Sequence, residues 1–398
     1  MAEKHSSLKR TLAEISLDRL AQNFRRIRDG LADGVKIMSV VKADAYGHGA
    51  TVVAPELQRL GSDAFAVSNI EEAVVLRRSC ITRPILVLGW VPPAWADVLL
   101  REQVETAVFS LESAAVLSEE AGKAGGIVSV HLKVDTGMGR LGIRASDEAS
   151  LAAAIAEITE IAQLPNLRIV GLFTHFSTAD EPESPLTAQQ FKLFTALREG
   201  LRERGIEIAT CHCANSAAAA LHPEYACDMV RAGVSLYGLS PDNSPHGALA
   251  EVCGGEPVMT LKTTVVQRRQ FFAGDTVSYG AKTLERDAEI AVIPVGYADG
   301  YPRLLSNCGS VGIGGKLVPI VGKVCMDMTM IDVSGVDAAE GSEVLLFGKT
   351  GDAWIPAETV ADAAGTIGYE LVCCIGRRVA RVYIKDQSEI HSVRLTTA

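Results

Sequence analysis

The chain has 398 residues, which is more than one hydrophobic core usually accommodates and is typical of two domains. A hydrophobic content of 48% and a charged content of 22% indicate a globular protein, and a net charge of −10 argues against nucleic acid or an anionic membrane as partner. Residues 1–10 lack the apolar core of a signal peptide, and no apolar run approaches the ~20 residues that span a bilayer.

The nine cysteines lack the spacing of a disulfide module or a zinc site. Cys211, His212 and Cys213 have no second ligand pair nearby, so we expect no metal. Cys373 and Cys374 lie in an apolar segment and are expected to be core residues. Reduced thiols of this kind predict a cytoplasmic location.

The first 245 residues alternate between helical and strand-like patterns. Apolar positions at helical spacing predict a helix over 17–31, and a short run at 11–16 precedes it. Eight short apolar runs follow, at 36–41, 64–68, 85–89, 105–109, 128–134, 168–174, 208–213 and 229–237. Amphipathic stretches separate these runs, which predicts parallel strands with crossover helices. Eight such units predict a (β/α)₈ barrel of the TIM type, an α/β fold.

From about residue 246, Gly- and Pro-rich turns separate short alternating runs, which predicts a mostly β domain. The runs lie at 258–267, 290–296, 317–321, 328–333, 343–347 and 379–384, with one short helix near 356–364. We therefore assign 12–245 to the barrel and 246–398 to the β domain, which residues 1–11 are expected to join. The run at 11–16 is also a candidate to pair with the β domain.

Chemically distinctive residues follow the ends of the predicted barrel strands, where barrel enzymes place their chemistry. In chain order they are Lys42, Leu88, Lys133, Asp135, Arg140, His175, Asn215, Ser216, Arg231 and Gly233. Lys42 ends the first apolar run, and apolar neighbours would desolvate its amine. Desolvation lowers the pKa of a lysine and makes the amine a usable nucleophile or base.

Nine segments, in one order across both predicted domains, resemble motifs of the alanine racemase family of fold-type III pyridoxal phosphate (PLP) enzymes. They are VVKADAYGHG (40–49), HLKVDTGMGRLG (131–142), THFSTAD (174–180), NSAA (215–218), RAGVSLYG (231–238), VSYGA (277–281), VGYADGYPR (295–303), VCMD (324–327) and TIGYE (366–370). The resemblance covers nearly the whole chain. It implies a PLP-dependent isomerase that interconverts L- and D-alanine, supplies D-alanine for cell-wall peptidoglycan and works as a homodimer with shared active sites.

The resemblance assigns the two catalytic bases. Lys42 would bind the cofactor covalently and serve one face of the substrate, and Tyr279 of the partner subunit would serve the opposite face. Racemisation removes a proton from one face and returns one to the other, so two bases do this with little movement. Tyrosine has a reference pKa of ~10 and needs positive charge or hydrogen bonding to act as a base, which His175 and Arg231 would supply.

The resemblance also assigns the cofactor and substrate contacts. Arg231 would face the ring nitrogen, and because arginine does not readily give up its proton the ring would stay nearly neutral, which disfavours transamination. The other expected cofactor contacts are Tyr46, Leu88, His175, Asn215, Ser216, Gly233, Val234 and Tyr369, among which Tyr46, Ser216, Gly233, Val234 and Tyr369 match phosphate-binding positions. Arg140, Met326, Tyr279 and Tyr297 are the expected substrate contacts, with Arg140 also bonded to the cofactor's phenolic oxygen. Tyr297 and Tyr301 would narrow the entrance, with ordinary packing as the alternative.

Lys133 lies on the polar side of an alternating run in which His131, Lys133 and Asp135 share one face. If that face points into the barrel, Lys133 and Arg140 become close like charges, which is unfavourable. In many members of the resembled family this lysine is carbamylated, which removes the clash. Pairing with Asp135 is the alternative.

Two other functions stay open at this point. A serine or broad-specificity amino-acid racemase would share these motifs, because a few pocket side chains decide the substrate and a methylene is worth only ~1–3 kcal/mol of discrimination. A non-catalytic PLP carrier would share the barrel but would lack the second domain and its tyrosine.

Overall fold

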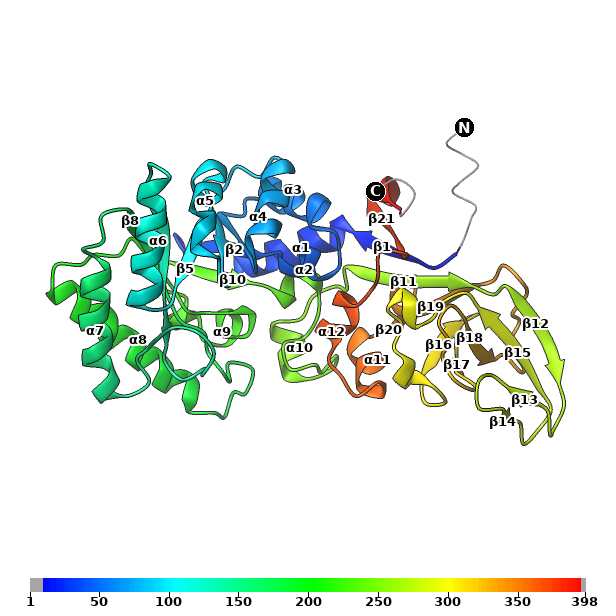
Figure 1. The fold of residues 1–398 in the computed structure, drawn as a ribbon. Helices are drawn as coiled ribbons and strands as arrows, with labels where there is room; N and C mark the ends of the chain where they lie inside the picture. The colour runs from blue at the N-terminus through cyan, green and yellow to red at the C-terminus, as the bar shows by residue number, and fades with distance from the viewer. Residues whose placement is uncertain (1–9, 395–398) are drawn as a thin grey trace.

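The computed structural model describes residues 10–394, which form a barrel and a mostly β domain that lie end to end (Figure 1). The eight strands of the barrel sheet run in the order β10 (Met229–Ala232), β2 (Lys36–Val40), β3 (Ala64–Val67), β4 (Ile85–Val87), β5 (Glu105–Val108), β6 (Val128–Asp135), β8 (Leu167–Phe173) and β9 (Thr210–His212), and the short β7 (Ile143–Arg144) pairs with β6. Neighbouring strands pair in parallel. Backbone hydrogen bonds from Asp228 to Cys211 (3.1 Å) and from Arg231 to Ala214 (3.0 Å) link β10 to β9 and close the ring.

All eight predicted barrel strands are present, but the last is shorter than predicted. The predicted run continued to residue 237, whereas β10 ends at Ala232 and a 3₁₀ helix, η4 (Val234–Tyr237), follows. Gly233 ends the strand because its φ of −120° and ψ of −102° lie outside the β region.

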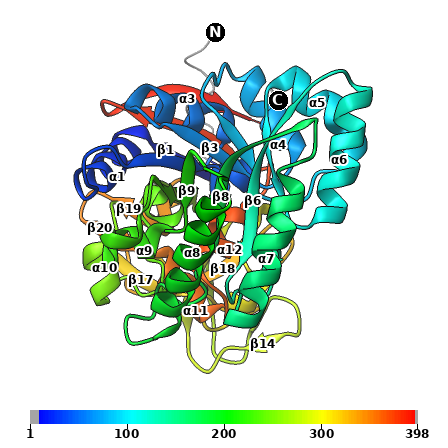
Figure 2. The same cartoon turned by 90° about the vertical axis from the view of Figure 1, so that its left-hand side faces the viewer.

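Helices cover the outside of the barrel (Figure 2). They are α1 (Leu17–Asp29), α3 (Ala50–Leu60), α4 (Ile70–Arg78), α5 (Ala96–Glu102), α6 (Leu111–Lys123), α7 (Glu148–Ile161), α8 (Leu186–Glu203) and α9 (Ser216–Leu221), with 3₁₀ turns η2 (Pro93–Trp95) and η3 (Pro223–Tyr225). The predicted first helix is α1. It begins after Ser16, whose hydroxyl accepts a hydrogen bond from the Arg19 N–H, and it buries Leu17, Leu20 and Phe24. None of the helices between residues 10 and 394 has the length and apolar character of a membrane-spanning helix.

The second domain is built on one large sheet. Its strands run in the order β17 (Lys316–Pro319), β16 (Ser310–Ile313), β19 (Glu343–Thr350), β11 (Met259–Thr264), β1 (Leu12–Ser16), β21 (Ala380–Lys385) and β22 (Ser388–Val393), and β20 (Ala353–Ile355) pairs with β19. Two smaller sheets contain β12 (Gln267–Phe271), β15 (Ala288–Ile293) and β18 (Thr329–Asp332), and β13 (Thr276–Val277) with β14 (Lys282–Thr283). Its helical segments are α10 (Ala248–Val252), η5 (Tyr297–Asp299), η6 (Arg303–Leu305), α11 (Ala357–Ala363) and α12 (Gly368–Cys373). The helix predicted near 356–364 is α11, and α12 was not predicted.

β1 joins the start of the chain to the second domain. It pairs antiparallel with β11 and in parallel with β21, which confirms the pairing expected for the run at 11–16. The barrel assignment that began at residue 12 is therefore corrected, since the extended run 12–16 completes the other sheet. The expectation for residues 1–9 lies outside the described residues, and the boundary near 246 stays a prediction.

Candidate active site

Lys42 begins a left-handed turn directly after β2. The turn forms the segment α2 (Lys42–Tyr46). The φ values are 51–54° at Ala43, Asp44, Ala45 and Tyr46. Such values are uncommon for residues other than glycine and cost energy, so the surroundings must hold the turn.

Both domains hold this turn. Ala45 donates a backbone hydrogen bond to Val41 O (2.9 Å), and the Asp44 carboxylate accepts one from the Ala50 N–H (2.7 Å). Arg381 on β21 donates from Nε to Gly47 O (3.1 Å). A Cβ at Gly47 would lie 2.3 Å from Val372 O of α12, so only glycine permits this approach of the two domains. The position of Lys42 therefore depends on contacts from the second domain.

The Lys42 side chain is half-buried and lies near the Arg140 guanidinium. Burial and then the Arg140 guanidinium lower its pKa, while Glu72 and Cys373 act in the opposite direction. A lowered pKa leaves more of the amine neutral at a given pH, which is the form that acts as a nucleophile or base. This agrees with the desolvation expected for the end of an apolar strand.

Arg231 is buried on β10 and is held by five acceptors. Its Nη1 donates to His212 Nδ1 (3.0 Å) and His212 O (2.9 Å), and its Nη2 contacts Thr174 O (2.8 Å), Cys213 O (2.8 Å) and His175 Nδ1 (3.2 Å). Burial lowers its pKa to about 10, which still leaves the guanidinium protonated at neutral pH. Within residues 10–394 the Nε–H makes no hydrogen bond, so one donor of this fixed cation stays available.

His175 follows β8 and lies against Arg231. Burial, then Arg231 and Lys133, depress its pKa well below the usual range. Arginine only donates, so His175 Nδ1 must accept and the neutral ring carries its proton on Nε2. His175 is therefore a neutral donor at the edge of the site.

Lys133 lies inside the barrel, as expected if the polar face of β6 points inward. His131 and Lys133 are both buried there. Burial, and then the charges of Arg231 and Arg140, lower the pKa of Lys133 to about 7, although the Asp135 carboxylate acts to raise it. Its Nζ donates to Val134 O (3.2 Å). The Asp135 carboxylate instead accepts from the backbone N–H groups of residues 137–139, so the alternative pairing with Lys133 is not formed.

Ser216, Gly233 and Tyr46 lie together at the ends of β9, β10 and β2. The Ser216 hydroxyl accepts hydrogen bonds from Gly233 N (2.9 Å) and Ser235 N (3.5 Å), and a Cβ at Gly233 would lie 3.1 Å from the Tyr46 hydroxyl. Asn215 caps α9 through Ala218 N (2.9 Å), Val234 begins η4, and Leu88 packs with Tyr46 against an apolar cluster in the barrel. The Tyr369 hydroxyl on α12 donates to Pro241 O (3.0 Å).

Tyr279, Met326 and Tyr297 lie on the second domain and are exposed. Tyr279 is 73% exposed in the turn between β13 and β14, at the end of this domain that points away from the barrel (Figure 1). The fold of one chain therefore does not bring Tyr279 to Lys42. Tyr297 N donates to Cys325 O (3.0 Å), which places Tyr297 beside the loop that carries Met326.

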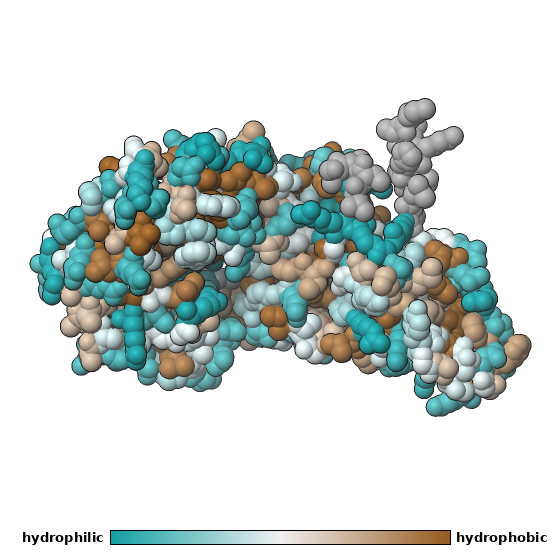
Figure 3. Space-filling view, in the orientation of Figure 1, coloured by the Kyte–Doolittle hydropathy of each residue, from teal (hydrophilic) through white to brown (hydrophobic). Residues whose placement is uncertain are grey.

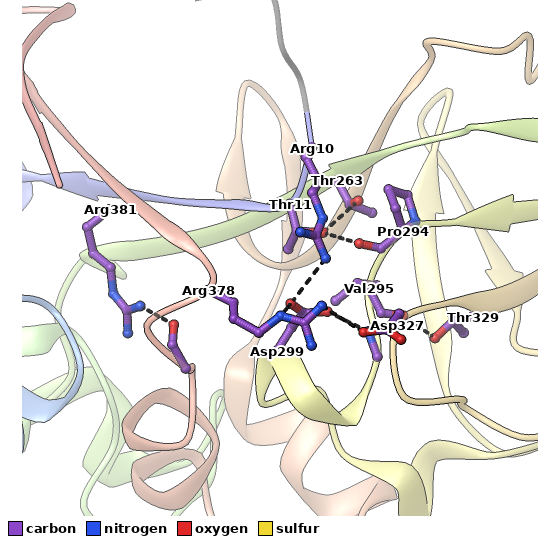
Figure 4. Close-up of polar contacts among 12 residues, drawn as sticks. Arg10, Thr11, Thr263, Pro294, Val295, Asp299, Asp327, Thr329, Arg378 and Arg381 are labelled. Carbon is purple, nitrogen blue, oxygen red and sulfur yellow. Dashed lines mark hydrogen bonds and ion pairs between the residues drawn. The ribbon is translucent and has the colours of Figure 1, made fainter. Parts of the chain in front are cut away.

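An ion-pair cluster built around Asp299 supports these two loops (Figure 4). Asp299, almost fully buried, pairs with Arg10 (3.6 Å) and Arg378 (3.4 Å), and Arg378 also pairs with Asp327 (2.7 Å). The second Asp299 oxygen accepts from Gly296 N (3.0 Å). The cluster thus fixes the residues that flank Tyr297 and Met326 in sequence.

Both parts of the chain match profiles of one protein family. Residues 15–241 match the N-terminal domain of alanine racemase, and residues 258–383 match its C-terminal domain. The chain belongs to the alanine racemase family. An alanine racemase of Clostridium novyi is 43% identical over 96% of this chain and 97% of its own length. One from Desulfosudis oleivorans is 44% identical over 94% and 97%.

Solved structures of the alanine racemase family have the same two-domain fold. The alanine racemase of Clostridium difficile 630 superposes with a TM-score of 0.89 at 38% identity, covering 96% of this chain and 98% of the other. That of Bacillus anthracis with bound L-Ala-P gives a TM-score of 0.89 at 34% identity, covering 98% of each chain. The predicted fold class is thereby confirmed.

Members of the alanine racemase family depend on PLP, and the donor groups of this chain fit that cofactor. Lys42 offers an amine of lowered pKa for covalent attachment, and Arg231 offers a free Nε–H for the ring nitrogen. Gly233 leaves space beside two hydroxyls, those of Ser216 and Tyr46, which suits a phosphate group. The described residues contain no group of three or more metal-ligating side chains.

Three expectations for individual side chains change. Tyr301 is fully buried, with no partner for its hydroxyl among the described residues, so it has the packing role and does not line an entrance. Cys373 and Cys374 are exposed and not core, because α12 is amphipathic and buries Leu371 and Val372 instead.

The sequence interpretation did not identify Glu105, His131 and His212 as part of the site. Arg231 reaches Glu105 through the two histidines by consecutive hydrogen bonds. His131 was placed on the polar face of its strand, and His212 was considered only as a metal ligand. No local pattern in the sequence connects the three residues, since they lie on β5, β6 and β9.

The lowered pKa of Lys133 predicts a pH-dependent stability. Between the folded value of about 7 and the unfolded value near 10.4, the unfolded chain binds more protons at this site, so stability rises with pH across that window. We expect Lys133→Met to be more stable than the wild type at pH 7, by on the order of 4 kcal/mol, and the difference to fade as pH approaches 10.5. Urea unfolding in CO₂-free buffer at equal cofactor content measures this difference.

The control for Lys133→Met is Lys36→Met, at the exposed start of β2, which should show no such pH trend. A neutral Lys133 amine would also react with CO₂, so bicarbonate should reduce the difference. A difference between Lys133→Met and the wild type that stays constant from pH 7 to 10.5 contradicts a lowered pKa of Lys133.

Proposed function

We propose that this chain interconverts L- and D-alanine with PLP, as a homodimer in which Lys42 of one subunit and Tyr279 of the partner subunit form each active site. The position of Lys42 carries the proposal. Its amine has a lowered pKa. Arg140, which contributes to that shift, and the buried Arg231 on β10 are the cations expected beside the cofactor. Membership in the alanine racemase family supports the same activity.

Each base would serve one face of the substrate. Bound PLP supplies an electron sink that makes the α-proton of an amino acid removable. Lys42 takes up or returns a proton on one face, and the phenolic oxygen of Tyr279 of the partner subunit does so on the other. Neither base has to cross the substrate, so racemisation needs little movement.

His175 and Arg231 would stabilise the ionised tyrosine. The tautomer derived for His175 leaves its Nε2–H as a donor, and Arg231 behind it carries a fixed positive charge. A hydrogen bond and a nearby cation both favour the phenolate form and lower the pKa of a tyrosine. Arg140 is proposed to hold the cofactor's phenolic oxygen beside the substrate, and the backbone of Met326 of the partner subunit the substrate carboxylate.

The surface of the second domain favours a dimer. Its large exposed apolar residues include Phe272, Tyr279, Leu304, Leu317, Met326 and Met328, and Figure 3 shows apolar patches on this domain. Apolar groups gathered on one surface are typical of protein–protein contacts. An interface that includes Tyr279 and Met326 would cover two of the residues that a shared site needs.

The proposed product suits a biosynthetic role. D-Alanine would supply cell-wall peptidoglycan, and the enzyme would work in the cytoplasm. All nine cysteines are free, as expected in a reducing compartment.

Turnover of a panel of amino acids tests the activity and its breadth. With alanine, serine, lysine and arginine in both enantiomers, we expect alanine to react fastest, with kcat/KM for serine lower by about 10–100-fold. Similar values for alanine and serine would support the broad-specificity alternative. Absence of alanine racemisation in the PLP-loaded enzyme would refute the proposal.

A further inference from the structure

A chain of hydrogen bonds crosses the barrel interior from Arg231 to the carboxylate of Glu105. Arg231 Nη1 lies 3.0 Å from His212 Nδ1, His212 Nε2 lies 2.9 Å from His131 Nδ1, and His131 Nε2 lies 3.0 Å from Glu105 Oε2. Four strands contribute one residue each, β10, β9, β6 and β5. The chain thus connects the cation of the active site to a carboxylate at the start of β5, whose side chain is 23% exposed.

The Arg231 guanidinium at one end of this hydrogen-bond series only donates, and the Glu105 carboxylate at the other end accepts, so every hydrogen bond in the series points from Arg231 toward Glu105. Arginine only donates, so His212 Nδ1 must accept, and the proton of this ring must be on Nε2. That N–H donates to His131 Nδ1, which places the proton of His131 on Nε2. The Glu105 carboxylate accepts it. A proton on His131 Nδ1 would set two N–H groups against each other, so this arrangement of hydrogen bonds requires His131 Nδ1 to be the acceptor.

Residues on β8 pack closely around the imidazole rings of His131 and His212. Phe173 stacks on His212 with ring centroids 4.9 Å apart and lies edge-on to His131 at 6.4 Å. A Cβ at Gly171 would lie 2.0 Å from His131 Nδ1, so only glycine on β8 leaves room for that ring. Burial and then Arg231 keep the pKa of His212 far below its usual value, in agreement with a neutral ring.

We infer that Glu105 is a positioning residue for the racemase reaction, which through His131 and His212 holds Arg231 in place and offsets its charge. This inference rests on the proposed function. Hydrogen bonds in a series polarise one another, so the carboxylate makes His212 Nδ1 a stronger acceptor for Arg231. A guanidinium held from behind in this way donates less strongly through its free Nε–H. The ring nitrogen of the cofactor, which this Nε–H would face, therefore stays unprotonated more easily.

Glu105→Gln tests the inference with Glu102→Gln as a matched control. Glu102 ends α5, and the charges of both glutamates act on the same Arg77, but only Glu105 contacts His131. We expect Glu105→Gln to lower kcat about tenfold, within the 10–100-fold range found when outer hydrogen-bond partners of metal sites are removed, with little change in KM. The visible absorption of the bound cofactor should shift in Glu105→Gln alone. Equal effects of the two variants would overturn the inference, since a role limited to Arg77 predicts them.

A measurement on the cofactor-free protein separates this inference from the proposed activity. Nitrogen NMR of ¹⁵N-histidine-labelled protein, assigned with His131→Gln and His212→Gln, should show both rings as neutral Nε2–H tautomers. In Glu105→Ala the His131 signals should move more than in Glu102→Ala. An Nδ1–H or doubly protonated form of either ring in the wild type would refute the proposed series of hydrogen bonds, even if the protein racemises alanine. Correct tautomers in a protein without racemase activity would refute the proposed function and leave the chain of hydrogen bonds standing.

Discussion

Lys42→Ala should abolish racemisation, with kcat falling by at least ~10⁴-fold. The variant loses both the covalent attachment of the cofactor and the base for one face of the substrate. Two-direction turnover assays with L- and D-alanine measure this loss. Both directions should fail equally, because each direction uses both bases.

Borohydride reduction followed by peptide mapping shows where the cofactor was attached. In the wild type we expect the label on Lys42, and in Lys42→Ala no label. Lys36→Ala, at the exposed start of the same strand, is the control and should keep activity and label. A label on Lys133, the other lysine of lowered pKa in the barrel, would show that the assignment of Lys42 is wrong.

The barrel could be predicted because its evidence is local. Each strand is a short apolar run, and the residue that ends the run is read directly from the sequence, as with Lys42 after β2 and His175 after β8. Since parallel strands end at one edge, the order of runs alone predicts that these side chains share a mouth. The same local reading extended the first run of the second domain to residue 267, past the end of β11 at Thr264, because the apolar Val265 and Val266 continue its pattern.

Other features depend on contacts between distant segments, which composition and periodicity do not reveal. β12 and β22 were missed because they are mostly exposed and polar, so they show little apolar alternation. The left-handed turn from Ala43 to Tyr46 contains no glycine that would have signalled it. Glu105, His131 and His212 meet only when the barrel closes, since 107 positions separate the first from the last (212 − 105).

The assignment of Tyr279 came from a resemblance, and the structure makes its consequence specific. In one chain Tyr279 is exposed on a hairpin away from the barrel, while the contacts of Arg381 and Gly47 hold the Lys42 turn against the second domain of its own chain. Each chain would therefore complete its own Lys42 environment and supply the opposing base to its neighbour. Activity would then be a property of the dimer, and dissociation alone should abolish it.

Heterodimers of two inactive variants should regain activity. We expect Lys42→Ala and Tyr279→Ala to be inactive alone, whereas a heterodimer of the two combines an intact Lys42 with an intact Tyr279 of the partner subunit in one of its two sites. Co-expression with two different affinity tags and sequential purification isolates it. Its activity should be about half that of the wild-type dimer, because a two-fold dimer has two equivalent sites.

The control for this heterodimer carries the same two substitutions in one chain. A Lys42→Ala/Tyr279→Ala chain paired with a wild-type chain should be inactive if sites are shared, because each site then lacks one base. If each site lay within a single subunit, the outcomes would exchange, with the control keeping about half the activity and the complementing heterodimer keeping none. The two heterodimers have identical composition, so a difference between them reports only which chain supplies each base.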